Sequence, residues 1–262
     1  EPASPKLRPK ITLSKATTRV TGPLTKDGYI DYVRVINQRL SVGVTAENNA
    51  NVLLWKAMGP HPEETNLGPQ LFKLMKTEML PETGDYFMSL DLFLTKQLKL
   101  TRSDDAWKQS WNAVTRGRLW TAADHPRIAA WLRFNEKPLA LVNEASRRSR
   151  YYAPLIVDSQ ETKPTGNAAT KSVSTMIEVL LPGAQVSRQF ARALASRAML
   201  RLADNQPEAA WADIIACHRL GYLVAEGPTV IETLVGHAIA GIAAEATLVY
   251  IDHVKPNARE SA

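Results

Sequence analysis

The sequence predicts an all-α protein, built as a multi-helix bundle or a short irregular α-solenoid. Through most of the 262 residues, apolar side chains recur three or four positions apart, the spacing that places them on one face of a helix. Proline and glycine interrupt this pattern, while the alternation typical of strands is scarce. With 45% hydrophobic and 22% charged residues, the composition is that of a globular protein with a substantial core.

Changes in composition divide the chain into five segments. These are a flexible tether (1–23), an N-terminal helical region (24–152), a linker (153–172), a C-terminal region of helical hairpins (173–255) and a polar tail (256–262). The tether is rich in proline, lysine and arginine. The linker contains Pro154, Pro164 and Gly166 among small polar residues, so it should interrupt the helical pattern.

In the N-terminal region, each expected helix lies between a plausible start and a breaker. Apolar stripes at helical spacing occupy 27–40, 45–58, 71–79, 86–100 and 103–114. Thr45 is a plausible N-cap for the second of these, and Gly59 ends it. Pro126 fits the first turn of a further helix, where a missing N–H is not needed. Pro138 should then kink or divide the segment that runs on to Tyr152.

The helical signal is strongest from Ala184 onward. The preceding run, 173–181, is short and apolar, so it fits either a strand or a buried helix. Pro182-Gly183 should end that element. Two helices then meet at a turn over 204–207. A third, packed with alanine and glycine, begins after a cap at Thr229.

Residues 189–223 resemble a tetratricopeptide-type helical hairpin. Four residues match its pattern of small and large apolar positions: Ala198, Ala210, Ile214 and Cys217. In that family, small residues let two antiparallel helices approach closely. Arg197 and Arg201 depart from the pattern, which has apolar residues there, and no second copy follows at the period of about 34 residues. The resemblance implies the shape of a helical repeat.

The run from Gly43 to Pro60, preceded by Asp31-Tyr32 and Asn37, resembles a family of uncharacterised exported planctomycete-type bacterial proteins. Residues 183–246 are similar to the later helical part of that family. The resemblance implies export and supplies no activity. A Pro/Lys-rich start also fits a tether that follows a removed signal or anchor. We therefore expect a periplasmic or cell-envelope location.

One group of ionisable residues suggests acid–base chemistry: Glu232, His237 and Glu245. His237, Gly241 and Glu245 are spaced i, i+4 and i+8, so they share one helical face, and Gly241 would leave a gap between the other two. A buried His/Glu pair with perturbed pKa values could work in such a gap. The alternative is that these residues pair with nearby arginines, namely Arg188, Arg192, Arg197, Arg201 and Arg219.

Other catalytic signals are absent from the sequence. No two of the five histidines form an i, i+4 pair, so no metal site is expected, and no phosphate loop or dinucleotide fingerprint predicts a cofactor. Cys217 lies in an apolar run and should be a buried structural thiol. The six tryptophans fall mostly on apolar stripes, which favours core packing over sugar binding.

The net charge of +6 favours anionic partners. Arg147, Arg148 and Arg150 precede two tyrosines and are candidates for binding an anion, such as an envelope polymer. Nucleic acid is not expected, because the positive charges are dispersed among 26 acidic residues without a recognition motif. The apolar run 230–251 contains three ionisable residues, so we expect a buried helix there and no transmembrane segment.

These patterns favour a non-catalytic helical interaction or scaffold domain whose partner is another protein. The alternative is a small-molecule-binding or hydrolytic enzyme that uses His237 and Glu245. Replacing His237 or Glu245 with alanine separates the two hypotheses, because it should abolish activity under the second and alter only stability under the first.

Overall fold

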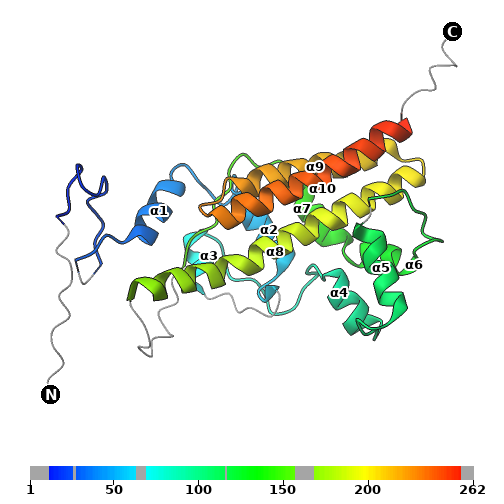
Figure 1. The fold of residues 1–262 in the computed structure, drawn as a ribbon, viewed down its shortest axis with the longest axis horizontal. Helices are drawn as coiled ribbons and strands as arrows, with labels where there is room; N and C mark the ends of the chain where they lie inside the picture. Colours follow the sequence, from blue (N-terminus) through cyan, green and yellow to red (C-terminus); the bar gives the residue numbers. More distant parts are fainter. Residues whose placement is uncertain (1–11, 26–27, 63–68, 116, 157–167, 255–262) are drawn as a thin grey trace, which may run out of the picture. The chain divides into compact units, whose positions relative to one another are not determined.

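The computed structural model describes residues 12–25, 28–62, 69–115, 117–156 and 168–254, with side chains from residue 183 onward in the last range. Within these ranges the chain contains ten α-helices, one π-helical segment and no strand (Figure 1). The predicted all-α class is confirmed. Contacts divide the chain into two compact units, 1–42 and 43–262.

The described residues of the first unit contain one helix, α1 (Tyr32–Leu40). Asp31 caps it, because its carboxylate accepts a hydrogen bond from the Arg34 N–H at 2.9 Å. The helix therefore begins later than the apolar stripe that starts at residue 27. Val35 is its buried residue.

The second unit begins with a buried helix, α2 (Ala50–Met58), which packs on α7 (Glu136–Ala145). Its N-cap is Asn49 rather than the predicted Thr45. The Asn49 carboxamide also accepts from the Tyr152 N–H at 2.9 Å and donates to the Tyr152 carbonyl at 3.1 Å. The cap thus joins α2 to a segment about a hundred residues away, a contact that local sequence does not reveal.

Shorter elements connect α2 to α7: α3 (Pro69–Leu74), α4 (Leu90–Leu92), the π-helical segment η2 (Phe93–Gln97), α5 (Asp105–Thr115) and α6 (Pro126–Phe134). The helix expected over 86–100 is thus limited to 90–97. Pro126 occupies the first turn of α6, as predicted. The segment after it divides at Asn135, and Pro138 lies in the first turn of α7, where proline is tolerated.

Three long helices follow in the described part of the unit: α8 (Ala168–Ala203), α9 (Pro207–Ala225) and α10 (Val230–Val254). They lie side by side, with α9 in contact with both neighbours (Figure 1). The predicted end of an element at Pro182-Gly183 is wrong, because α8 runs through both residues. A single proline removes one helical hydrogen bond, a loss that a long helix packed over its following turns can absorb. Of the predicted linker, residues 157–167 lie outside the described residues.

Two glycines set the distance between α9 and α10. A Cβ atom on Gly236 would lie 2.6 Å from the Gly221 carbonyl oxygen and 2.6 Å from the Ala225 backbone nitrogen. A Cβ on Gly221 would lie 3.0 Å from the Gly236 carbonyl oxygen. The two backbones are therefore in direct contact, which only glycine permits.

Candidate functional site

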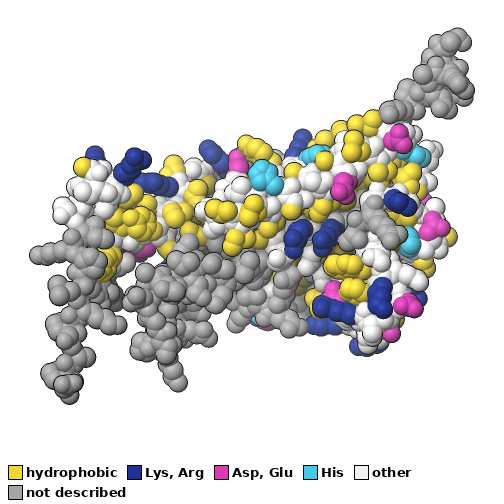
Figure 2. Space-filling view, in the orientation of Figure 1, with side chains coloured by type: hydrophobic (Ala, Val, Ile, Leu, Met, Phe, Trp, Pro, Cys, Tyr) yellow, Lys and Arg dark blue, Asp and Glu magenta, His cyan; other side chains and the backbone are white. Residues whose placement is uncertain are grey.

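The outward face of α10 is rich in exposed apolar side chains. Of the fifteen large hydrophobic residues that are exposed in the described part of the chain, five belong to α10: Val230, Leu234, Leu248, Ile251 and Val254. Leu234 and Leu248 are 63% and 69% exposed. Hydrophobic side chains gather along this helix in Figure 2. Because scattered single hydrophobics are normal on a surface, it is their concentration on one helix that matters.

Four of these five side chains, all except Val254, follow a regular spacing that continues through His237 and two smaller residues. Exposed positions recur in steps of four and three residues: Val230, Leu234, His237, Gly241, Ala244, Leu248 and Ile251. We call this set the α10 seam. Its 4-3 spacing is that of the a and d positions of a coiled coil, which align along one side of a helix. The opposite side of α10 packs on α8 and α9, so the helix has two apolar sides, one of which is uncovered.

The structure corrects the expected buried His/Glu pair. His237 lies in the α10 seam and Glu245 at its flank, and both side chains are exposed. They are about 12 Å apart along the helix, so they do not touch. No described residue forms a hydrogen bond or ion pair with either. The sequence could not place them because α10 is apolar on nearly all sides, which hides the side that faces the core.

Glu232, the third candidate, is buried at the start of α10. It forms a capping box with Thr229: its carboxylate accepts from the Thr229 hydroxyl at 2.8 Å and N–H at 3.2 Å, and its own N–H donates to the Thr229 hydroxyl. A further hydrogen bond joins it to Tyr151. Burial raises the pKa of Glu232 to about 7, although the bonds from Thr229 and Tyr151 lower it.

Glu232 faces a cavity of about 30 Å³ that Trp55, Tyr151 and Ser187 also line. The Trp55 indole N–H is buried and has no hydrogen-bond partner among the described residues. A space of this size holds about one water molecule. Although the carboxyl group has a perturbed pKa, the cavity is too small for a substrate.

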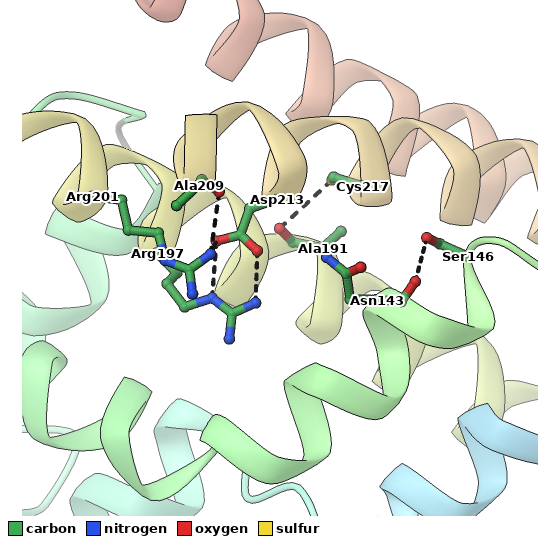
Figure 3. A network of polar contacts seen from close by, with 8 residues as sticks. All are labelled: Asn143, Ser146, Ala191, Arg197, Arg201, Ala209, Asp213 and Cys217. Atoms are coloured by element: carbon green, nitrogen blue, oxygen red, sulfur yellow. Dashed lines mark hydrogen bonds and ion pairs between the residues drawn. The ribbon is translucent and has the colours of Figure 1, made fainter. Parts of the chain in front are cut away.

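Of the five arginines that were expected to pair with the candidate residues, Arg197 and Arg201 bind a different acid. Asp213 in α9 is fully buried and accepts from Arg197 at 2.6 and 2.9 Å and from Arg201 at 2.7 Å (Figure 3). Arg201 also donates to the Ala209 carbonyl at 3.2 Å. This network holds α8 to α9 and accounts for the two departures from the tetratricopeptide pattern. Two arginines four residues apart on an otherwise apolar stripe are the sequence signal that could have identified it.

A larger cavity, of about 650 Å³, lies between α4, α5 and α8. Trp107 and Trp111 stack beside it with ring centroids 5.3 Å apart. Asp91 accepts from the Trp107 indole at 3.1 Å and from Arg102 at 2.5 Å. Arg192 lies over the Trp111 ring at 5.5 Å. We call these five residues the tryptophan pocket. Trp107 and Trp111 pack against the hydrophobic core, as their stripe predicts, and they also line this cavity.

Arg192 is the unusual member of the tryptophan pocket. No carboxylate of the described residues pairs with it, and burial together with the neighbouring Arg188 lowers its pKa. A half-buried cation beside another cation favours an anion in its vicinity. The pocket therefore combines flat aromatic walls with a positive group.

The predicted anion-binding arginines separate in the structure. Arg147 and Arg148 line a cavity of about 710 Å³ with His218 and Arg219 from α9, but Arg150 does not. Arg148 has a structural role, because its guanidinium donates hydrogen bonds to the carbonyls of Ala46 and Asn49 at 2.5 and 2.9 Å. Tyr152, the second of the two tyrosines that follow these arginines, is buried. Of the predicted cluster, Arg147 alone is exposed at this cavity without a described partner.

Other sequence expectations concern single residues and the membrane. Cys217 is buried as predicted, and burial raises its pKa to about 12. The described residues contain no group of three or more His, Cys, Asp or Glu placed to hold a metal ion. By length and composition α10 could cross a membrane, with a mean hydropathy of 1.6, but core helices of soluble proteins meet the same criterion.

Comparisons with family models, curated proteins and solved structures find no match for this chain.

Proposed function

We propose that the chain is a non-catalytic interaction domain that binds an α-helix along the α10 seam. The observation that supports this best is the 4-3 repeat of exposed residues from Val230 to Ile251, in which every member except His237 is apolar or small. A contiguous apolar stripe on a helix marks an interaction site, and a second helix covers it by inserting side chains between those of the seam.

The remaining features are compatible with a scaffold of this kind. Ala198 and Ala210 are fully buried between α8 and α9, which supports the proposal of a tetratricopeptide-like hairpin. The resemblance of residues 43–60 and 183–246 to exported proteins supports a location outside the cytoplasm. Fractionation of source cells tests the location, since recovery of the protein in the cytosol alone would refute it.

The interaction is tested by a photo-crosslinking amino acid placed at Leu234 or Leu248 in source cells. The matched control is Met79, a 55% exposed hydrophobic residue outside α10. We expect both seam positions, and not Met79, to form an adduct with one protein. With that protein purified, Leu234→Glu should weaken binding by at least about tenfold, because burying a leucine contributes about 2 kcal/mol.

The proposal fails if neither seam position forms an adduct with any protein. It also fails if Met79→Glu and Leu234→Glu weaken binding of the adduct protein equally, because the loss would then not belong to the seam.

A second function, binding of a small anion with a flat body, is favoured by the tryptophan pocket. The anionic group would lie against Arg192 and the flat body against Trp107. Titration with aromatic carboxylates and uronic acids should quench tryptophan fluorescence saturably. Arg192→Gln should abolish that response, whereas Trp211→Leu, a change outside the pocket, should retain it. An unsaturable response in the unmodified chain would exclude this function.

A further inference from the structure

The exposed face of α10 is nearly palindromic about Gly241. Leu234 and Leu248 lie seven residues on either side of Gly241, and Ala238 and Ala244 lie three residues on either side. All of these residues are exposed. A helix that binds an unrelated partner has no need of such symmetry.

The residues four positions from Gly241 are complementary instead of identical. His237 precedes it and Glu245 follows it, and both are exposed. Within one chain they are separated by about 12 Å along the helix axis and cannot bond to each other. In an antiparallel pair of α10 helices, a residue that precedes Gly241 lies opposite one that follows it in the partner. His237 would then face the partner's Glu245, and the same contact would occur a second time by symmetry.

Gly241 is suited to the centre of such a pair. A Cβ atom placed there would have no atom within 4 Å, so the glycine is not required by packing inside the chain. In contrast, Gly236 on the inner side of the same helix touches the backbone of α9. A glycine in the middle of an exposed helical surface costs about 0.5–1 kcal/mol relative to alanine. Its absent side chain would let two helices cross closely.

From these observations we propose that a second copy of this chain covers the α10 seam, in an antiparallel dimer whose two-fold axis passes Gly241. A two-fold interface uses the same patch on both subunits, so the patch must be complementary to itself. The α10 seam meets this condition in shape, through its leucine and alanine pairs, and in charge, through His237 and Glu245. This inference rests on the proposed function and names its partner.

The existence of the dimer is tested by sedimentation equilibrium of the full chain between about 1 and 200 µM. The expected species has twice the 29.0 kDa mass of the chain. Leu234→Glu should yield monomer, and the control Met79→Glu should leave the dimer unchanged. A chain that stays monomeric at 200 µM overturns the proposal, and so does a dimer that Leu234→Glu does not weaken.

The position of the axis is tested by single cysteines and oxidation. Gly241→Cys should crosslink with itself, because its two copies meet at the axis. Leu234→Cys and Leu248→Cys should each remain uncrosslinked alone, since their own copies are about 21 Å apart along the helix. A mixture of the two should crosslink. The natural Cys217 is buried and should not contribute. Rapid crosslinking of Leu234→Cys with itself would indicate a parallel pair and overturn the proposal.

Exchanging the residues at positions 237 and 245 tests the charge pairing. His237→Glu places two carboxylates opposite each other at both symmetric contacts and should raise the dimer dissociation constant about tenfold. The double variant H237E/E245H restores the complementary pairs and should return the constant to near its original value. Because these residues do not touch within one chain, rescue requires contact between copies. Absence of rescue overturns the proposed register.

A result that refutes the dimer differs from a result that refutes the proposed function. A monomeric chain whose Leu234 photo-adduct is another protein retains the interaction function and loses the second copy as its partner. A monomeric chain that forms no protein adduct, and instead binds phosphatidylglycerol vesicles through Leu234, overturns both.

Discussion

Glu232 provides a sharp test of the structure, because a buried carboxyl group makes stability depend on pH. Its pKa is raised from 4.5 to about 7 in the folded chain, chiefly by burial. We consider Glu232→Gln, which removes the charge. The amide oxygen can still accept the hydrogen bonds from Thr229, so the capping box should persist.

Proton binding decides whether stability rises or falls with pH. Between pH 4.5 and 7 the folded chain holds a proton on Glu232 that the unfolded chain has lost, so stability falls as the pH rises through this window. The shift of about 2.5 pH units corresponds to about 3 kcal/mol. The unmodified chain and Glu232→Gln should therefore have similar stability at pH 4.5. At pH 8 the variant should be more stable by up to about 3 kcal/mol.

Urea unfolding followed by circular dichroism, at pH steps from 4.5 to 8.5, measures the difference between the two proteins. A single low protein concentration is needed, because dissociation of the proposed dimer would otherwise contribute. The matched control is Glu208→Gln, which alters an exposed carboxylate in the first turn of α9. If the free-energy difference between the unmodified chain and Glu232→Gln is constant across this range, the reasoning about burial is wrong.

Three further predictions concern packing and reactivity. Asp213→Ala should lower the free energy of unfolding by about 3–5 kcal/mol in urea, because it leaves two arginines without their buried partner; a loss below 1 kcal/mol would contradict the network. Gly236→Ala should lower the melting temperature, because its Cβ would meet the Ala225 backbone at 2.6 Å, whereas Gly241→Ala has open space and should keep or raise the melting temperature of the monomer. Cys217 should resist iodoacetamide at pH 8 in the folded chain and react in urea, as measured by mass spectrometry; equal rates in both states would show that the thiol is accessible.

Much of the fold follows from local patterns in the sequence. The apolar spacing identified α9, α10 and the part of α8 from Ala184 onward. Pro126 and Thr229 marked two helix starts correctly, because capping and proline geometry depend on neighbouring residues. Pro182-Gly183 misled the prediction, since tertiary packing can keep a helix intact across a local breaker. The cap at Asn49 was missed because its other partner, Tyr152, is remote in sequence.

The candidate site shows the same division between local and tertiary information. The sequence by itself determined that His237, Gly241 and Glu245 share one side of an apolar helix, because the helical period alone sets which residues align. It could not determine whether that side faces the core. The tertiary structure decided this: Gly221 and Gly236 bring α9 against the opposite side of α10, and so leave His237 and Glu245 exposed at the surface. An apolar helix with two similar sides carries no local signal for which one its neighbours will cover.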